Sequence, residues 1–186
     1  MKKALAFLMA AVMLMSMLTA CGNKDNADNK DNNDVNTEET DKAAADKVAA
    51  LIDAIYVQER TEETDAQCEA AKAAWDALTD AQKALVEGEE ASPDYFGLDT
   101  GDASKDDPRN QDEIGEKELL VVSFGTSFND SRVADIKSIE DALQEANPDW
   151  SVRRAFTAQI IINHIQARDG EKIDNMEQAL ERAVAN

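Results

Sequence analysis

The sequence predicts a mixed α/β region at residues 118–186, preceded by a small all-α helical segment and two disordered linkers. Three observations lead to this prediction. Residues 119–122 form a short continuous apolar run, which is typical of a buried parallel strand. Residues 42–86 carry apolar side chains at helical spacing. The segments 21–41 and 87–117 are rich in acidic and small polar residues, and too little apolar surface is available there to offset the entropy cost of ordering.

Residues 1–20 have the pattern of a secretory signal peptide. Two lysines precede an apolar run at 4–18 that is too short to span a membrane. The run ends in Leu-Thr-Ala-Cys-Gly at 18–22, which looks like a lipobox. We therefore expect Cys21 to be diacylated and to anchor the exported chain on the extracytoplasmic face of the membrane, since two acyl chains hold firmly. An ordinary secretory signal with an incidental cysteine is the alternative.

The charge of the chain excludes some partners. The 186 residues carry a net charge of -20, which argues against binding nucleic acid or docking electrostatically on anionic lipid. The tether at 21–41 and the acidic linker at 87–117 hold much of this charge. The second cysteine, Cys68, has no partner if Cys21 is lipidated, so neither a disulfide nor a cysteine-based metal site is expected.

The helical segment at 42–86 shows two apolar stripes and a cap. The stripes consist of Val48, Leu51, Ile52 and Ile55, and of Cys68, Ala71, Trp75 and Leu78. Thr79 and Gln82 fit a capping box that opens a short third helix with Leu85 and Val86. Trp75 could be a stacking platform for a ligand, but its position in a stripe favours helix packing.

The α/β region is predicted to have the order β-α-β-α-α. A helix capped by Asn129, Asp130 or Ser131, with an apolar stripe of Ile136, Ile139 and Leu143, follows the strand at 119–122. A second strand at 152–156 leads to a helix that we expect Thr157 to cap and Gly170 to end. Asn175 and Gln178 suggest a capping box for the last helix. Helical crossovers imply a parallel sheet, and because two strands rarely form a stable one, we expect the chain to be a fragment.

The candidate site lies where the strands end. Ser123, Gly125, Thr126 and Ser127 follow the first strand, and hydroxyls beside a helix N-terminus can hold a carboxylate or phosphate. One of the two arginines in the second strand, Arg154 being our choice, is expected to face an anionic group there. The alternatives are a simple strand-to-helix turn and arginines that face solvent or a helix. The chain's one histidine, His164, lies on a helix and is expected to be structural.

Three motifs in this order resemble the N-terminal section of the anaerobic sirohydrochlorin cobaltochelatases. They are Leu-Val-Val-Ser-Phe-Gly-Thr-Ser at 120–127, Arg-Arg-Ala-Phe-Thr at 153–157, and Arg-Asp-Gly at 168–170 with Ile173 and Asp174. The resemblance implies a chelatase fold of two α/β halves around a tetrapyrrole cleft, lined in part by residues 123–127. It also implies insertion of cobalt, the substrate metal, into sirohydrochlorin for anaerobic cobalamin biosynthesis.

The resemblance carries no catalytic residue onto this chain. The metal-binding histidines of the family lie in later strands, so we assign no catalytic residue and no metal ligand, and expect no cofactor to be bound. The partners implied are a tetrapyrrole and a divalent metal. We therefore expect a cobaltochelatase-like protein that is inactive in this form. The alternatives are a non-catalytic tetrapyrrole- or metal-binding surface lipoprotein, and an interaction module built on the helical segment.

Overall fold

The computed structural model describes residues 31–92 and 100–185. The predicted signal peptide, Cys21 and the first part of the tether lie outside these residues. The chain divides into two compact units, Met1–Asp34 and Val35–Asn186, and the second contains all the contacts discussed below. In the described ranges, no helix combines the length and apolar character that crossing a membrane requires.

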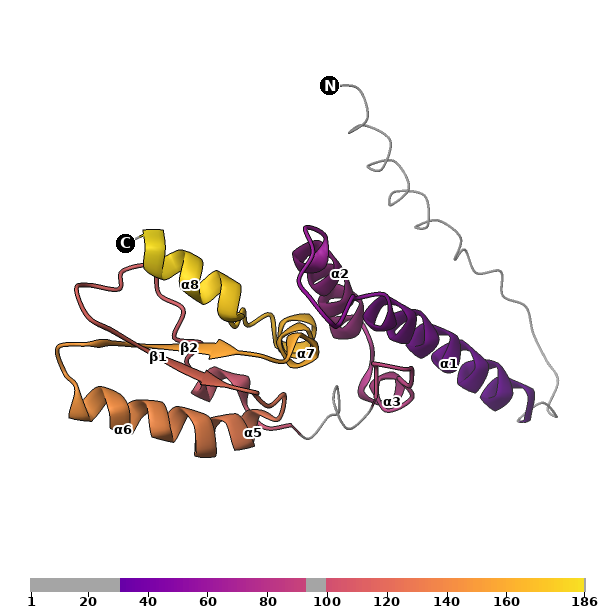
Figure 1. Cartoon of the computed structure of the whole chain (residues 1–186). Helices are drawn as coiled ribbons and strands as arrows, with labels where there is room; N and C mark the ends of the chain where they lie inside the picture. Colours follow the sequence, from indigo (N-terminus) through magenta and orange to yellow (C-terminus); the bar gives the residue numbers. More distant parts are fainter. Residues whose placement is uncertain (1–30, 93–99, 186) are drawn as a thin grey trace, which may run out of the picture. The chain divides into compact units, whose positions relative to one another are not determined.

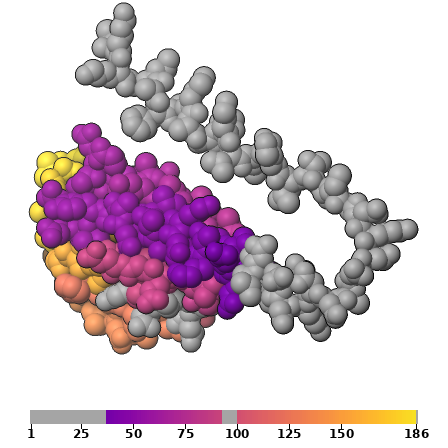
Figure 2. Space-filling model, turned by 90° about the vertical axis from the view of Figure 1, so that its right-hand side faces the viewer, coloured from indigo at the N-terminus to yellow at the C-terminus, as the bar shows by residue number. Residues whose placement is uncertain are grey.

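Three helices form the N-terminal part of the second unit: α1 (Asp31–Asp53), α2 (Thr64–Asp76) and α3 (Asp80–Lys83). Figure 2 shows the surface of these helices in indigo to magenta. Their buried core contains most of both predicted stripes, namely Val48, Ile52, Ile55, Cys68, Ala71 and Trp75, together with Val86. Leu51 is 39% exposed, so its place in the stripe was wrong. The capping box of Thr79 and Gln82 is confirmed in both directions, and Trp75 is a packing residue.

Helix α1 begins earlier than predicted, at Asp31 rather than Lys42. The prediction of disorder is therefore wrong for the last part of the tether. Two contacts near the predicted boundary help to explain the extension: Lys42 pairs with Asp46 one turn later, and Gln82 donates to the Asp41 carboxylate over 2.8 Å. Once a turn of helix is packed, extending it by further residues does not repeat the cost of helix nucleation. Acidic residues are also favourable near a helix N-terminus because of the helix dipole.

The C-terminal part is a two-stranded parallel sheet with helices on both faces (Figure 1). Strand β1 (Glu118–Ser123) runs beside β2 (Ser151–Phe156), with Ser123 opposite Phe156 at their ends. Between them the chain forms α5 (Asn129–Ser131), a π-helical turn at Arg132–Lys137, and α6 (Ser138–Ala146). After β2 come α7 (Gln159–Asp169) and α8 (Met176–Ala185), and α8 lies on the face opposite α6. The predicted order and strand direction are confirmed.

Some local predictions in this part were wrong. The helix after β1 starts behind Phe128 without a side-chain cap, and Asn129 is buried inside it. Ala158 rather than Thr157 precedes α7. Strand β2 is almost entirely buried, but β1 is only partly so, because α6, α7 and α8 pack mainly on β2. The capping box of Asn175 and Gln178 and the left-handed Gly170 at the end of α7 are confirmed.

Helix α7 joins the two parts. Residues 161–168 are all buried, including polar side chains that no single apolar stripe explains. Ala167 belongs to the core of the N-terminal helices. Asn163 donates to the Tyr56 carbonyl over 3.0 Å, and Gln166 donates to Asp65 over 2.6 Å. Burial on several sides at once explains why the helix lacks an amphipathic pattern.

The described half of the acidic linker is part of the fold. Residues 100–117 lie against the α/β part, where Thr100 and Ile114 are buried and a 3₁₀ turn spans Ala103–Lys105. Asp106 is bonded to two buried arginines. The prediction of a disordered linker is therefore wrong for this stretch, because composition does not reveal that an acidic residue has a buried cation to pair with. Tyr95 and Phe96 lie outside the described residues.

Candidate functional site

The two segments predicted to form a site meet at the carboxyl edge of the sheet. The loop at 123–127 follows β1, and Thr157 follows β2. The Thr157 amide donates to the Ser123 carbonyl over 2.9 Å, so the ends of both strands are held together. Open α/β sheets bind their ligands outside this edge. The structure thus brings Ser123, Gly125, Thr126 and Ser127 to the expected place.

Gly125 lets this loop pass close to β2. Its φ is +93°, and a Cβ atom there would lie 2.5 Å from Cδ2 of Phe156. No other residue type fits both the left-handed backbone and this approach without a shift. The loop therefore has a defined shape that depends on the buried Phe156 ring.

The hydroxyl groups of the loop differ in their surroundings. The Thr126 hydroxyl accepts from the Phe128 amide over 3.2 Å, which fixes the turn into α5. Ser127 is 3% exposed. The Ser123 hydroxyl is buried and has no hydrogen-bond partner among the described residues. Buried polar atoms are normally satisfied, so the Ser123 hydroxyl has bonding capacity that the described fold leaves unused.

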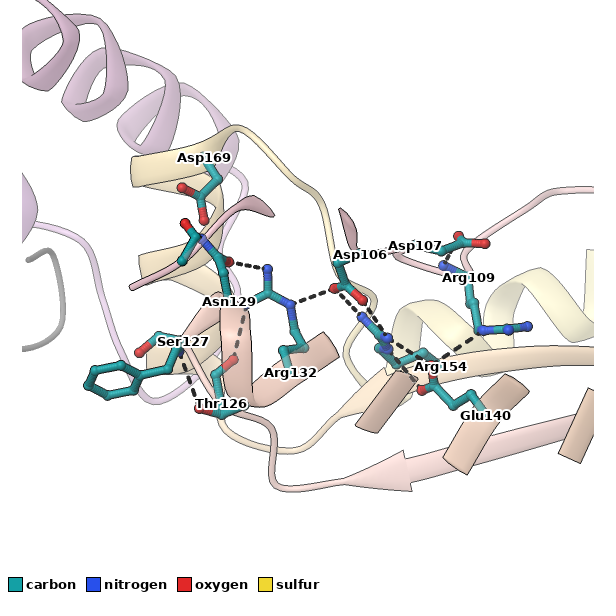
Figure 3. Close-up of polar contacts among 12 residues, drawn as sticks. Asp106, Asp107, Arg109, Thr126, Ser127, Asn129, Arg132, Glu140, Arg154 and Asp169 are labelled. Carbon is teal, nitrogen blue, oxygen red and sulfur yellow. Dashed lines mark hydrogen bonds and ion pairs between the residues drawn. The ribbon is translucent and has the colours of Figure 1, made fainter. Parts of the chain in front are cut away.

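Two arginines that sequence reasoning did not assign to the site hold the loop carbonyls, and Figure 3 shows one of them, Arg132, beside Thr126 and Asn129. Arg132 donates to the Thr126 carbonyl over 3.3 Å, and Arg168 donates to the Ser127 carbonyl over 2.7 Å. Both also reach the Asn129 side-chain oxygen, at 2.5 and 3.3 Å. Each arginine is at most 6% exposed. Their positions depend on how α5 and α7 pack, which no local pattern indicates.

Arg154 lies deeper than the cleft position we predicted for it. It is completely buried and donates to both oxygens of Glu140 and of Asp106 (Figure 3). Burial by itself would raise the pKa of Asp106, but the hydrogen bonds and charges of Arg154 and Arg132 outweigh it and lower that pKa. The Arg154 charge is therefore neutralised inside the fold by Glu140 and Asp106. Its contact with a ligand stays a prediction.

His164, which we expect to be structural, is buried within the fold. It is 2% exposed on α7. Burial is the main cause that lowers its pKa to about 4; a hydrogen bond with the Glu90 backbone opposes this shift, and the charge of Arg168 adds to it. Across the two described ranges, no group of three or more histidine, cysteine or acidic side chains has the arrangement of a metal site.

A polar pocket of about 290 Å³ opens beside the loop, and sequence reasoning missed it. It is lined by three segments: Gln58–Arg60 between α1 and α2, Asn175–Glu177 at the start of α8, and Phe156, Thr157 and Gln159 from the end of β2 to the start of α7. Phe156 also lies against Gly125, so the pocket and the loop share a wall. A sequence pattern could not indicate this pocket, because Gln58–Arg60 lie far along the chain from the other two segments.

Comparisons with known proteins place the resemblance in the α/β part. Residues 117–186 match the family model described as cobalt chelatase (CbiK). A sirohydrochlorin cobaltochelatase of Salmonella typhimurium is 44% identical over 70 residues, which are 38% of this chain and 26% of that protein. The chain thus spans about a quarter of the length of this relative. No solved structure matches the chain. The resemblance to the cobaltochelatases is confirmed for these residues.

Proposed function

We propose that residues 117–186 form part of the tetrapyrrole cleft of a cobaltochelatase-like protein. The observation that carries this proposal is the loop at 123–127, which lies at the ligand-binding edge of a parallel sheet within the segment that matches the chelatase family. Gly125 and Phe156 fix its shape, and Arg132 and Arg168 donate hydrogen bonds to its carbonyls. A preformed loop of this kind can receive a large flat ligand without a cost for ordering it.

We further propose that this chain binds a tetrapyrrole but does not by itself insert cobalt. Metallating the macrocycle requires a base that takes pyrrole protons and ligands that deliver the metal. His164 is buried, and the nearby carboxylates of Asp106 and Asp169 are paired with arginines. The groups described at this edge therefore suit binding better than proton transfer. Insertion of Co(II) into sirohydrochlorin for anaerobic cobalamin synthesis would require a base and metal ligands besides the groups described at this edge.

The Ser123 hydroxyl offers a sharp test of binding. Ser123→Ala removes a buried hydroxyl that has no described partner, so stability should stay the same or rise slightly. If the hydroxyl bonds the ligand, the dissociation constant for sirohydrochlorin should rise about 3- to 10-fold. Binding is followed anaerobically through the absorption spectrum of the tetrapyrrole. Ser138→Ala, on the exposed start of α6, is the matched control. Equal binding by the two variants would mean that the loop is only a turn.

The same samples test the absence of insertion. After addition of Co(II), the spectrum should remain that of the metal-free macrocycle, at the rate seen without protein. Faster insertion by the chain would contradict our second proposal. Binding without insertion also fits the alternative, a non-catalytic tetrapyrrole-binding lipoprotein, which the internal pairing of Arg154 and the burial of His164 favour.

We also propose that the chain is an exported lipoprotein anchored through Cys21. The sequence Leu-Thr-Ala-Cys-Gly at 18–22 after an apolar run supports this. Mass spectrometry of the protein extracted from membranes should show a diacylated N-terminal cysteine and no residues 1–20. A retained Met1 or an unmodified Cys21 would contradict the proposal.

A further inference from the structure

The pocket beside the loop contains a cation from outside the chelatase-like segment. Arg60 lies on the connection between α1 and α2, whereas the family match starts at residue 117. Among the residues that line the pocket, Arg60 is the only positively charged one. Its side chain is 20% exposed, so it is partly desolvated but accessible. The N-terminal helices thus contribute a charge to the ligand-binding edge of the sheet.

Two helix starts also line the pocket. Gln159 begins α7, whose preceding residue Ala158 offers no side-chain cap. Met176 begins α8, where the capping box of Asn175 and Gln178 satisfies the Gln178 amide but leaves the helix dipole in place. The first amides of a helix have no partner within the helix, and the helix dipole adds partial positive charge there. The two acidic residues of the lining, Glu59 and Glu177, are exposed, so water screens them. The inner part of the pocket therefore suits a carboxylate.

Arg60 can leave its present partner at low cost. It pairs with Asp65, but the same carboxylate also accepts from Gln166 over 2.6 Å and lies 3.7 Å from Lys172. Asp65 therefore keeps two partners when the guanidinium turns away. Arg60 in turn gains a planar, two-point contact if a carboxylate enters the pocket.

We infer that Arg60 and the starts of α7 and α8 bind one carboxylate arm of the tetrapyrrole. This inference rests on the proposed function. A volume of about 290 Å³ is below the usual range for whole ligands, and it suits an acetate or propionate arm while the macrocycle lies over the loop at 123–127. The N-terminal helices would then be a specificity element that favours the more carboxylated tetrapyrroles.

The test uses Arg60→Gln and two fluorescent probes, uroporphyrin and the less carboxylated coproporphyrin. We expect Arg60→Gln to weaken uroporphyrin binding about tenfold at low salt and coproporphyrin binding less. Lys42→Gln is the matched control, since it removes the same charge from an exposed pair on α1. Fluorescence titration gives the affinities, and circular dichroism verifies the fold. If the unchanged chain binds neither porphyrin, the proposed function fails. If it binds them and Arg60→Gln behaves like Lys42→Gln, only the role of Arg60 is overturned.

Asp65→Asn separates binding from a structural role. This change releases Arg60 from its counter-ion while an amide oxygen remains for Gln166. If Arg60 binds the ligand, Asp65→Asn should tighten uroporphyrin binding. If the Arg60–Asp65 pair only supports the fold, both variants should weaken binding, and that result would contradict the inference.

Discussion

The guanidinium of Arg154 lies against the carboxylate of Glu140, with its Nε 2.9 Å from one oxygen and an Nη 2.7 Å from the other. Both side chains are completely buried. The pair connects β2 to α6, and Asp106 adds two further bonds to the same guanidinium, at 2.7 and 3.0 Å. The Arg154 guanidinium thereby joins β2 to α6 and to Asp106 of the predicted linker.

Breaking this pair should destabilise the chain strongly. Glu140→Gln keeps the size of the side chain but leaves a buried cation with less compensation, which should cost about 3 kcal/mol of unfolding free energy. Asp141→Asn is the matched control, because Asp141 is exposed and pairs with Arg109 and Lys137. Removing its charge should cost less than about 1 kcal/mol of unfolding free energy. Urea denaturation measures both. Similar costs for the two variants would mean that the buried pair contributes no more than a surface one.

Acid should weaken the contacts of Asp106. Its pKa is lowered in the fold, so its contribution to stability is complete above its ordinary pKa near 3.8 and is lost as the pH falls through the lower folded value. The unfolding free energy should therefore drop below about pH 4. In Asp106→Asn this drop should be smaller, and the unfolding free energy at neutral pH should already be lower than that of the unchanged chain. Urea titrations between pH 2 and 7, on the order of one per pH unit, give both curves. An unchanged acid slope in the variant would contradict the assignment.

His164 should affect stability at higher pH than Asp106. Its pKa falls from an ordinary value of 6.5 to about 4 in the fold, so the native state disfavours the added proton. The contribution is present above pH 6.5 and is lost between 6.5 and about 4, with a slope of at most about 1.4 kcal/mol per pH unit. Because it is the chain's one histidine, its NMR titration is directly assignable. A midpoint near 6.5 would show that the ring is exposed to water.

Substituting Gly125 should affect the fold as well as the binding. Gly125→Ala places a Cβ atom on a positive-φ backbone and 2.5 Å from the Phe156 ring, and we expect a loss of about 2–3 kcal/mol. Gly115→Ala is the matched control, since Gly115 also has a positive φ, but its Cβ would meet only the Ser151 hydroxyl, 3.9 Å away. It should cost about 1 kcal/mol. Thermal unfolding compares them. Equal losses would mean that the ring moves aside freely.

Much of the fold was predictable from local pattern. The apolar run at 119–122, the stripe around Cys68 and Trp75, and the capping boxes at Thr79 and Asn175 specified elements that the structure confirms. These signals depend on side chains within a few residues of each other, so the sequence alone contains them. The position of the loop at 123–127 was also predictable, because parallel strands bring their carboxyl ends to one edge.

The partners of the charged residues were not predictable in this way. Asp106 looked like one more solvated acid, and Arg154 looked like a residue that faces a ligand. The two residues bond each other across 48 residues of sequence, and Arg154 also bonds Glu140, 14 residues away. Arg60 meets the starts of α7 and α8 only because α2 packs on α7.

The sequence by itself thus determined the strands, the helices, the chelatase-like motifs and the edge where a ligand would bind. Only the tertiary structure decided which charges are internal, which hydroxyl keeps unused bonding capacity, and which distant arginine reaches the pocket. The physical reason is that helix and strand formation depends on near neighbours. A charged side chain, by contrast, can be buried only where the fold places an opposite charge or a dipole beside it, and that partner can lie far away in the sequence.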